Sequence, residues 1–98
     1  ITQKGGVSMI TRQIVLGGEL PFSPLRLKSL ADAAGQYQVR VLIRQGAKTY
    51  NGKSLLGLMA LAREREREVT LVVDGVDEHQ AAEHLATLLA GQTPAPLS

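Results

Sequence analysis

A chain of 98 residues has room for one domain around one apolar core, which excludes a multidomain enzyme within these residues. Hydrophobic residues make up 44% of the sequence and charged residues 20%, so we expect a folded globular domain rather than a disordered chain. The absence of cysteine excludes disulfides, a thiolate nucleophile and a cysteine-ligated metal site, and no apolar run approaches the length needed to cross a bilayer.

The net charge of +2 hides an uneven distribution along the chain. Residues 1–53 contain eight lysines and arginines and two acids, whereas residues 54–98 contain three arginines and seven acids. This asymmetry suits docking on an acidic protein surface, because complementary fields accelerate encounter.

With one Phe and two Tyr, the chain lacks a base-stacking platform. The first residues lack the apolar core of a signal peptide. We therefore expect a cytoplasmic protein with protein partners, no nucleic acid and no membrane.

Both ends of the chain have the composition of linkers. Residues 1–9 are mostly polar, and residues 91–98 contain prolines, which neither extend a helix nor join a sheet ladder. We expect one domain over residues 10–90. The ends fit either a stand-alone protein with tails or a domain cut from a longer polypeptide.

The domain begins with a predicted strand and a predicted helix. A run with β-branched residues at positions 10–16 predicts the strand, which stops at a pair of glycines. Ser23 followed by Pro24 predicts a helix N-terminus, because serine caps the first turn and proline is tolerated there. Gly35 is placed to end this helix in a left-handed conformation. The apolar stripe of the helix is Leu27, Leu30, Ala31 and Ala34.

A hairpin and a second helix follow. Alternation over residues 38–44, a turn at Gln45-Gly46 and the short run 48–50 predict the hairpin. Ser54 is predicted to cap a strongly apolar helix over about residues 54–61.

The last two elements complete an open-faced sandwich. Residues 69–73 predict a strand, and Asp77 is predicted to cap a helix that runs to about Ala90. Its apolar face is Ala81, Leu85, Leu88 and Leu89. The order β-α-β-β-α-β-α predicts an α+β fold in which three helices cover one face of a four-stranded antiparallel sheet.

Residues 46–54 invite comparison with a phosphate-binding P-loop, since they end in Gly-Lys-Ser between a strand and a helix. The spacing excludes this motif, because Ala47 stands where its first glycine is needed.

Two histidines lie in the last predicted helix, His79 and His84. Five residues separate them, so they face different directions and do not suit a shared metal ion. We expect them at the surface, one of them capping the helix or pairing with Glu83 or Asp77. No catalytic residue, metal site or cofactor is predicted.

Residues 63–68 alternate arginine and glutamate at every position. An extended chain would place the two charges on opposite sides, whereas a helix would allow pairs three and four residues apart. The favoured interpretation is a solvated connector, and the alternative is a docking surface.

One segment resembles a known family. Lys53-Ser54-Leu55-Leu56-Gly57-Leu58-Met59-Ala60-Leu61 resembles the regulatory-serine segment of the HPr-like phosphocarriers of the sugar phosphotransferase system. Residues 69–85, with the turn Gly75-Val76-Asp77-Glu78, are similar to the last strand and closing helix of that family. The resemblance covers about residues 10–90 and implies the same open-faced sandwich.

The chain departs from the family at its active site. Active HPr proteins carry Gly-Leu-His-x-Arg-Pro at the start of the first helix, where the histidine accepts phosphate from Enzyme I. In the register set by Ser54, Ser23 is the equivalent of that histidine and Leu25 of the arginine, with Arg26 one residue away. A serine hydroxyl cannot form the labile phosphoramidate that a carrier passes on. The resemblance therefore implies a member without the phosphocarrier histidine.

The loop after the second helix also departs from the family. Ala62 and Glu66 stand where the family has glycines, and good helix formers fill residues 58–66. We therefore expect this helix to run longer than in the family.

A histidine-less relative, Crh, implies a function. It keeps the regulatory serine, is phosphorylated there by HPr kinase and acts as a corepressor partner. By resemblance, Ser54 is the candidate phosphoacceptor, and Arg26, Lys53, Leu56 and Met59 are candidate docking residues. We predict a regulatory module rather than an enzyme, with HPr kinase, a transcription regulator or phosphotransferase components as partners. Two alternatives stay open: a non-catalytic HPr-like domain of a larger phosphotransferase protein, and a residual phosphocarrier.

Overall fold

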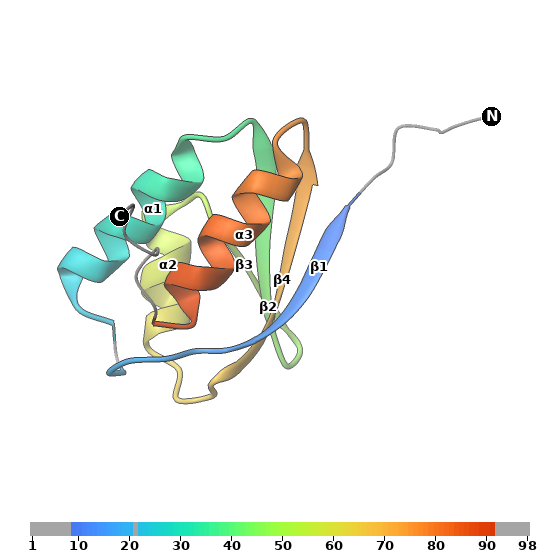
Figure 1. Cartoon of the computed structure of the whole chain (residues 1–98). Coiled ribbons are helices and arrows are strands. Elements are labelled where there is room, and N and C mark those ends of the chain that lie inside the picture. Colours follow the sequence, from blue (N-terminus) through green and yellow to red (C-terminus); the bar gives the residue numbers. More distant parts are fainter. Residues whose placement is uncertain (1–8, 21, 92–98) are drawn as a thin grey trace, which may run out of the picture.

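The computed structural model describes residues 9–20 and 22–91, which form four strands and three helices in the predicted order. The elements are β1 (Ile10–Val15), α1 (Pro24–Gly35), β2 (Val39–Gln45), β3 (Lys48–Asn51), α2 (Leu55–Ala62), β4 (Glu68–Gly75) and α3 (Glu78–Leu89). The strands form one antiparallel sheet in the order β1-β4-β2-β3. All three helices lie on one face of this sheet (Figure 1). The predicted open-faced sandwich is confirmed; the predicted linker and tail lie outside the described residues except for Met9 and Gly91.

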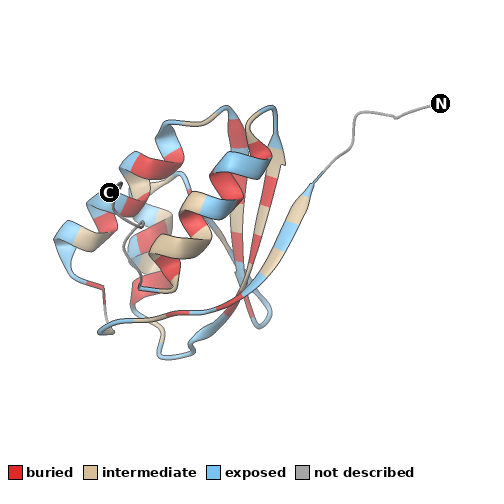
Figure 2. Cartoon of the chain, viewed as in Figure 1, coloured by how far each residue is buried: buried red, intermediate tan, exposed pale blue. Residues whose placement is uncertain are grey.

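The core lies between the sheet and the helix layer (Figure 2). In β4, Val69, Leu71 and Val73 are buried toward the helices, and the residues between them are half-buried on the open face. The helices contribute buried leucines from all three elements: Leu27, Leu30, Leu58, Leu61, Leu85 and Leu89. Each fully buried leucine stabilises the fold by about 1.5–3 kcal/mol. This burial fixes the positions of α1 and α2, which carry the two serines singled out by the sequence.

Two helix ends differ from the prediction. Gly35 is the last residue of α1 but does not adopt a positive φ; Gln36 stays near helical geometry (φ −73°) and donates its N–H to Ala33 O at 3.2 Å. This tight last turn satisfies the carbonyls without a left-handed residue. Asp77 precedes α3 but makes no side-chain cap, because its Oδ2 accepts the N–H of Gln38 at 2.9 Å instead.

Helix α2 ends at Ala62 and does not continue through the helix formers at residues 63–66. Contacts with distant residues draw the following segment out of the helix. Arg67 O accepts the N–H of Leu16 at 2.7 Å, and Glu66 O accepts Nε2 of Gln45 at 2.8 Å. Helix propensity over these positions is worth only tenths of a kcal/mol per residue, which such tertiary hydrogen bonds outweigh.

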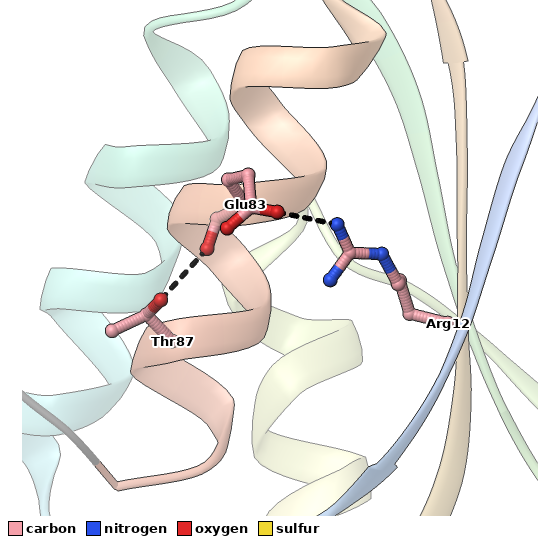
Figure 3. A network of polar contacts seen from close by, with 3 residues as sticks. All are labelled: Arg12, Glu83 and Thr87. Carbon is pink, nitrogen blue, oxygen red and sulfur yellow. Dashed lines mark hydrogen bonds and ion pairs between the residues drawn. The ribbon is translucent and has the colours of Figure 1, made fainter.

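Strand β1 lies at the edge of the sheet and is tied to α3 by an ion pair. The Arg12 guanidinium donates to the carboxylate of Glu83, and the hydroxyl of Thr87, one turn later, donates to Glu83 O at 2.9 Å (Figure 3). Both charged side chains are largely exposed, so the pair contributes at most about 1 kcal/mol. Glu83 therefore pairs with Arg12 and not with a histidine.

Candidate functional site

Ser23 is the N-cap of α1. Its backbone is extended (φ −68°, ψ 157°), and its Oγ accepts the N–H of Arg26 at 3.2 Å. Pro24 occupies the first turn, where a missing N–H has no cost. Ser23 is exposed, and the Leu25 side chain beside it is 80% exposed. The position equated with the family histidine thus carries a hydroxyl that caps a helix, next to a leucine in solvent.

The guanidinium of Arg26 is directed to the C-terminus of α3. Nη1 donates to Gly17 O at 2.6 Å, and Nη2 donates to Leu88 O and Leu89 O at 3.0 and 3.1 Å. The guanidinium also lies over the Phe22 ring, 4.1 Å from its centroid. A cation at the carbonyl end of a helix complements the helix dipole. Arg26 was predicted as a docking residue; in the structure it ties the β1–α1 loop to α3.

Arg67, at the end of the segment between α2 and β4, also binds the β1–α1 loop. Its Nη1 donates to Leu16 O at 2.8 Å and to Gly18 O at 3.2 Å. Burial lowers the pKa of the Arg26 guanidinium, and repulsion by the nearby Arg67 lowers this pKa further. The sequence did not predict the contacts of Arg26 with Leu88 O and Leu89 O, because these partners are 62 and 63 residues away in the chain.

His84 lies far from the first turn of α1. Its Nδ1 is 2.8 Å from the hydroxyl of Tyr37, and the two rings meet edge to face with centroids 5.8 Å apart. Tyr37 follows the C-terminus of α1, whereas Ser23 precedes its N-terminus; the 12 residues of α1 span about 18 Å. His79 is exposed in the first turn of α3. The structure therefore does not bring either imidazole to Ser23, and the predicted pairing of a histidine with Glu83 or Asp77 is replaced by the contact with Tyr37.

Ser54 is the N-cap of α2, as predicted. Its Oγ accepts the N–H of Gly57 at 3.2 Å, and its backbone is extended (φ −105°, ψ 127°). Gly57 is needed for close packing, since a Cβ there would lie 2.4 Å from Asn51 O. The helix N-terminus is thereby held against the end of β3, with the serine side chain half-buried.

Lys53 precedes Ser54, but its charge is used elsewhere. Nζ donates to Tyr37 O at 3.0 Å and to Val39 O at 3.1 Å, so the side chain fastens the loop between α1 and β2. The residue itself is exposed. A phosphate on Ser54 would compete with these two carbonyls for the ammonium group.

Helix α2 presents apolar side chains to solvent as well as to the core. Leu56 is 77% exposed, and Leu55 and Met59 are exposed to 48% and 45%. Leu25 is a further exposed leucine, at the start of α1, a helix that packs beside α2 (Figure 1). Exposed apolar side chains gathered on one helix mark protein–protein contact sites. Leu56 and Met59 were predicted; Leu25 and Leu55 were missed, although the strongly apolar composition of residues 55–62 was a usable signal.

The described residues contain no group of three or more His, Asp or Glu side chains that could hold a metal ion. Within the same residues, no helix combines the length and the hydropathy that crossing a membrane requires.

Comparison with known proteins places the chain among bacterial phosphotransferase components. The family profile "PTS HPr component phosphorylation site" matches residues 28–91. The chain is 37% identical to the phosphocarrier protein HPr of Lysinibacillus sphaericus over 81 residues, which cover 83% of this chain and 92% of that protein. It is 42% identical to the HPr-like protein Crh of Bacillus subtilis over 53 residues, 54% of this chain and 62% of Crh.

Solved structures agree with this similarity. HPr from Bacillus anthracis superposes with a TM-score of 0.75 at 23% identity, covering 84% of this chain and 98% of that one, which speaks for the fold. The crystal structure of Bacillus subtilis Crh, described as a domain-swapped dimer, gives a TM-score of 0.68 at 27% identity and covers 97% of this chain and 99% of that one.

Proposed function

The chain belongs to the HPr-like phosphocarrier family of the phosphotransferase system, and we propose that it is a regulatory protein-binding member that carries no phosphohistidine and accepts phosphate on Ser54. Proteins of this family carry phosphate and do not catalyse its transfer, so the question is which side chain receives the phosphoryl group and which surface a partner reads.

The observation that carries the proposal is the first turn of α1. Ser23 caps the helix there, and both histidines of the chain belong to α3, where His84 contacts Tyr37 at the opposite end of α1. Onward transfer needs a labile phosphoryl bond, such as the phosphoramidate of an imidazole nitrogen. A phosphoester on the Ser23 hydroxyl would be too stable to pass on.

Ser54 is the proposed acceptor; it stands at the N-terminus of the eight-residue helix α2, beside the cation of Lys53 and the exposed apolar side chains of that helix. The free N–H groups of the first turn and the helix dipole both favour an anion at this place. A phosphoserine would add about −1.5 to −2 charges and three acceptor oxygens there. Lys53, one residue away, supplies a cation that the phosphate could recruit.

The proposed docking surface consists of the exposed apolar side chains of α2, Leu55, Leu56 and Met59, with Lys53 at its edge. A partner that fits this surface offers an apolar patch rimmed by acids. Substitution of an exposed side chain in this docking surface should weaken the affinity for a protein partner and leave the stability of the fold unchanged. Leu56→Glu tests this, with Val76→Glu as the matched control, since Val76 is equally exposed (83%) in the turn between β4 and α3.

Two phosphorylation assays test the proposal. With HPr kinase and ATP we expect one phosphate on Ser54 by mass spectrometry, none in Ser54→Ala, and an unchanged product in Ser29→Ala, a control for an exposed serine on α1. With phosphorylated Enzyme I we expect no transfer. Acid-labile phosphate on His79 or His84 would overturn the non-carrier assignment, and a kinase product modified elsewhere would overturn the assignment of Ser54.

A further inference from the structure

Two hollows border the connector between α2 and β4. One, of about 650 Å³, is lined by Arg63, Arg65 and Arg67, together with Glu64 and the apolar side chains of Leu20 and Ala62. The other, of about 730 Å³, is lined by Glu64, Glu66 and Glu68 and by the cations Arg44 and Lys48, among other residues. The three arginines of the connector therefore gather at one hollow, whereas Glu66 and Glu68 line only the other.

The positive charges that line the smaller hollow are not neutralised by acidic side chains of its own lining. Among the described residues, the side chains of Arg63 and Arg65 have no hydrogen-bond or ion-pair partner. Glu64, the one carboxylate in the lining, is paired with Lys48 at 3.3 Å. Arg67 donates only to carbonyl oxygens, which leave its full charge in place.

The backbone that carries these arginines is held on both sides. Glu64 N donates to Leu61 O at 3.1 Å, and the carbonyls of Glu66 and Arg67 accept from Gln45 and Leu16. Gln45 is itself buried, with 5% of its surface exposed. A ligand would therefore not have to order the backbone of the loop and would order only the side chains of Arg63 and Arg65.

From this arrangement we propose that the hollow of Arg63, Arg65 and Arg67 binds a small anion that carries two phosphate groups. Guanidinium groups present paired N–H donors that match phosphate oxygens. Three guanidinium groups carry a charge of +3, which two linked phosphates balance better than a single phosphate does. The volume falls within the range of about 300–1,000 Å³ typical of small-molecule sites. An acidic peptide is the weaker fit, because only Leu20 and Ala62 offer apolar anchors.

Inorganic pyrophosphate is the probe that tests the site. Titrated into the full chain at low salt, it should bind saturably by calorimetry, with amide NMR shifts concentrated in residues 62–67 and Leu20. Arg65→Gln should weaken the affinity about tenfold, the loss expected for one charged hydrogen-bonding partner, and added salt should weaken it further. Arg65 makes no contact on which the fold depends, so this variant should keep the wild-type melting temperature.

Two matched controls decide the outcome. Arg40→Gln removes the same charge from the open face of β2, away from both hollows, and should leave the affinity unchanged. Ser54→Ala should also leave it unchanged, because this site is separate from the proposed phosphoacceptor. Absence of saturable binding, or equal losses in Arg40→Gln and Arg65→Gln, would overturn the proposal. Orthophosphate binding as tightly as pyrophosphate would overturn its two-phosphate part.

Discussion

Replacement of Arg26 by methionine should destabilise the protein strongly, although Arg26 lies on a helix with exposed neighbours. The side chain makes three hydrogen bonds to carbonyls, of Gly17, Leu88 and Leu89. Hydrogen bonds of a charged group contribute about 1.5–3 kcal/mol each when buried. Partial exposure, the cost of burying the charge and repulsion by Arg67 reduce the sum. We expect a net loss of about 2–3 kcal/mol, because methionine keeps the packing on the ring of Phe22 but removes the side-chain donor to Gly17 O and one of the two donors to Leu88 O and Leu89 O, which also accept the N–H groups of Gly91 and Gly17.

Urea and thermal unfolding followed by circular dichroism measure this loss. For a domain of this size it corresponds to a fall in Tm of about 10–20 °C. Arg40→Met is the control: Arg40 is exposed on β2, and its loss should cost less than about 0.5 kcal/mol. Arg26→Lys should recover less than half, since one ammonium group cannot reach Gly17 on one side and the end of α3 on the other. An Arg26→Met protein as stable as the control would refute the assignment of Arg26 as the tie between the β1–α1 loop and α3.

Three further changes test the helix ends. Gly57→Ala places a Cβ 2.4 Å from Asn51 O, a backbone atom that cannot move aside, so urea unfolding should show a loss of about 1–3 kcal/mol; an unchanged midpoint would contradict the close packing of α2 on β3. Ser54→Ala should lose about 1 kcal/mol by removing the cap of α2, whereas Ser54→Asp should retain it, and equal stabilities of the two variants would contradict the cap. Tyr37→Phe should cost about 1 kcal/mol and shift the imidazole nitrogen resonances of His84, which would stay in place if the hydrogen bond did not form.

Much of the fold was predictable because its signals are local. The alternation over residues 69–73 places three side chains on one face of a strand in any context, and Ser23 and Ser54 each cap the helix that follows them. The same logic identified the apolar helix after Ser54, whereas its exposed residues Leu56 and Met59 were singled out by the resemblance to the HPr-like family.

Predictions failed where a distant group competed with the local one. Asp77 had the right type and position for a cap, but the amide of Gln38, on the neighbouring loop, took its carboxylate. Good helix formers follow Ala62, yet hydrogen bonds from Gln45 and Leu16 draw the chain away from helical geometry. A local preference of tenths of a kcal/mol per residue does not survive such competition.

The order of the elements, the faces they bury and the presence of serine at the start of two helices were determined by the sequence alone, because each depends on neighbours within a few positions. The destinations of the long cationic side chains were decided only by the tertiary structure. Arg26, Lys53 and Arg67 all end on backbone carbonyls, which every residue possesses and which therefore leave no mark in the sequence. Flexible side chains of this length choose among many acceptors, and only the packed arrangement of sheet and helices determines which acceptors lie within reach.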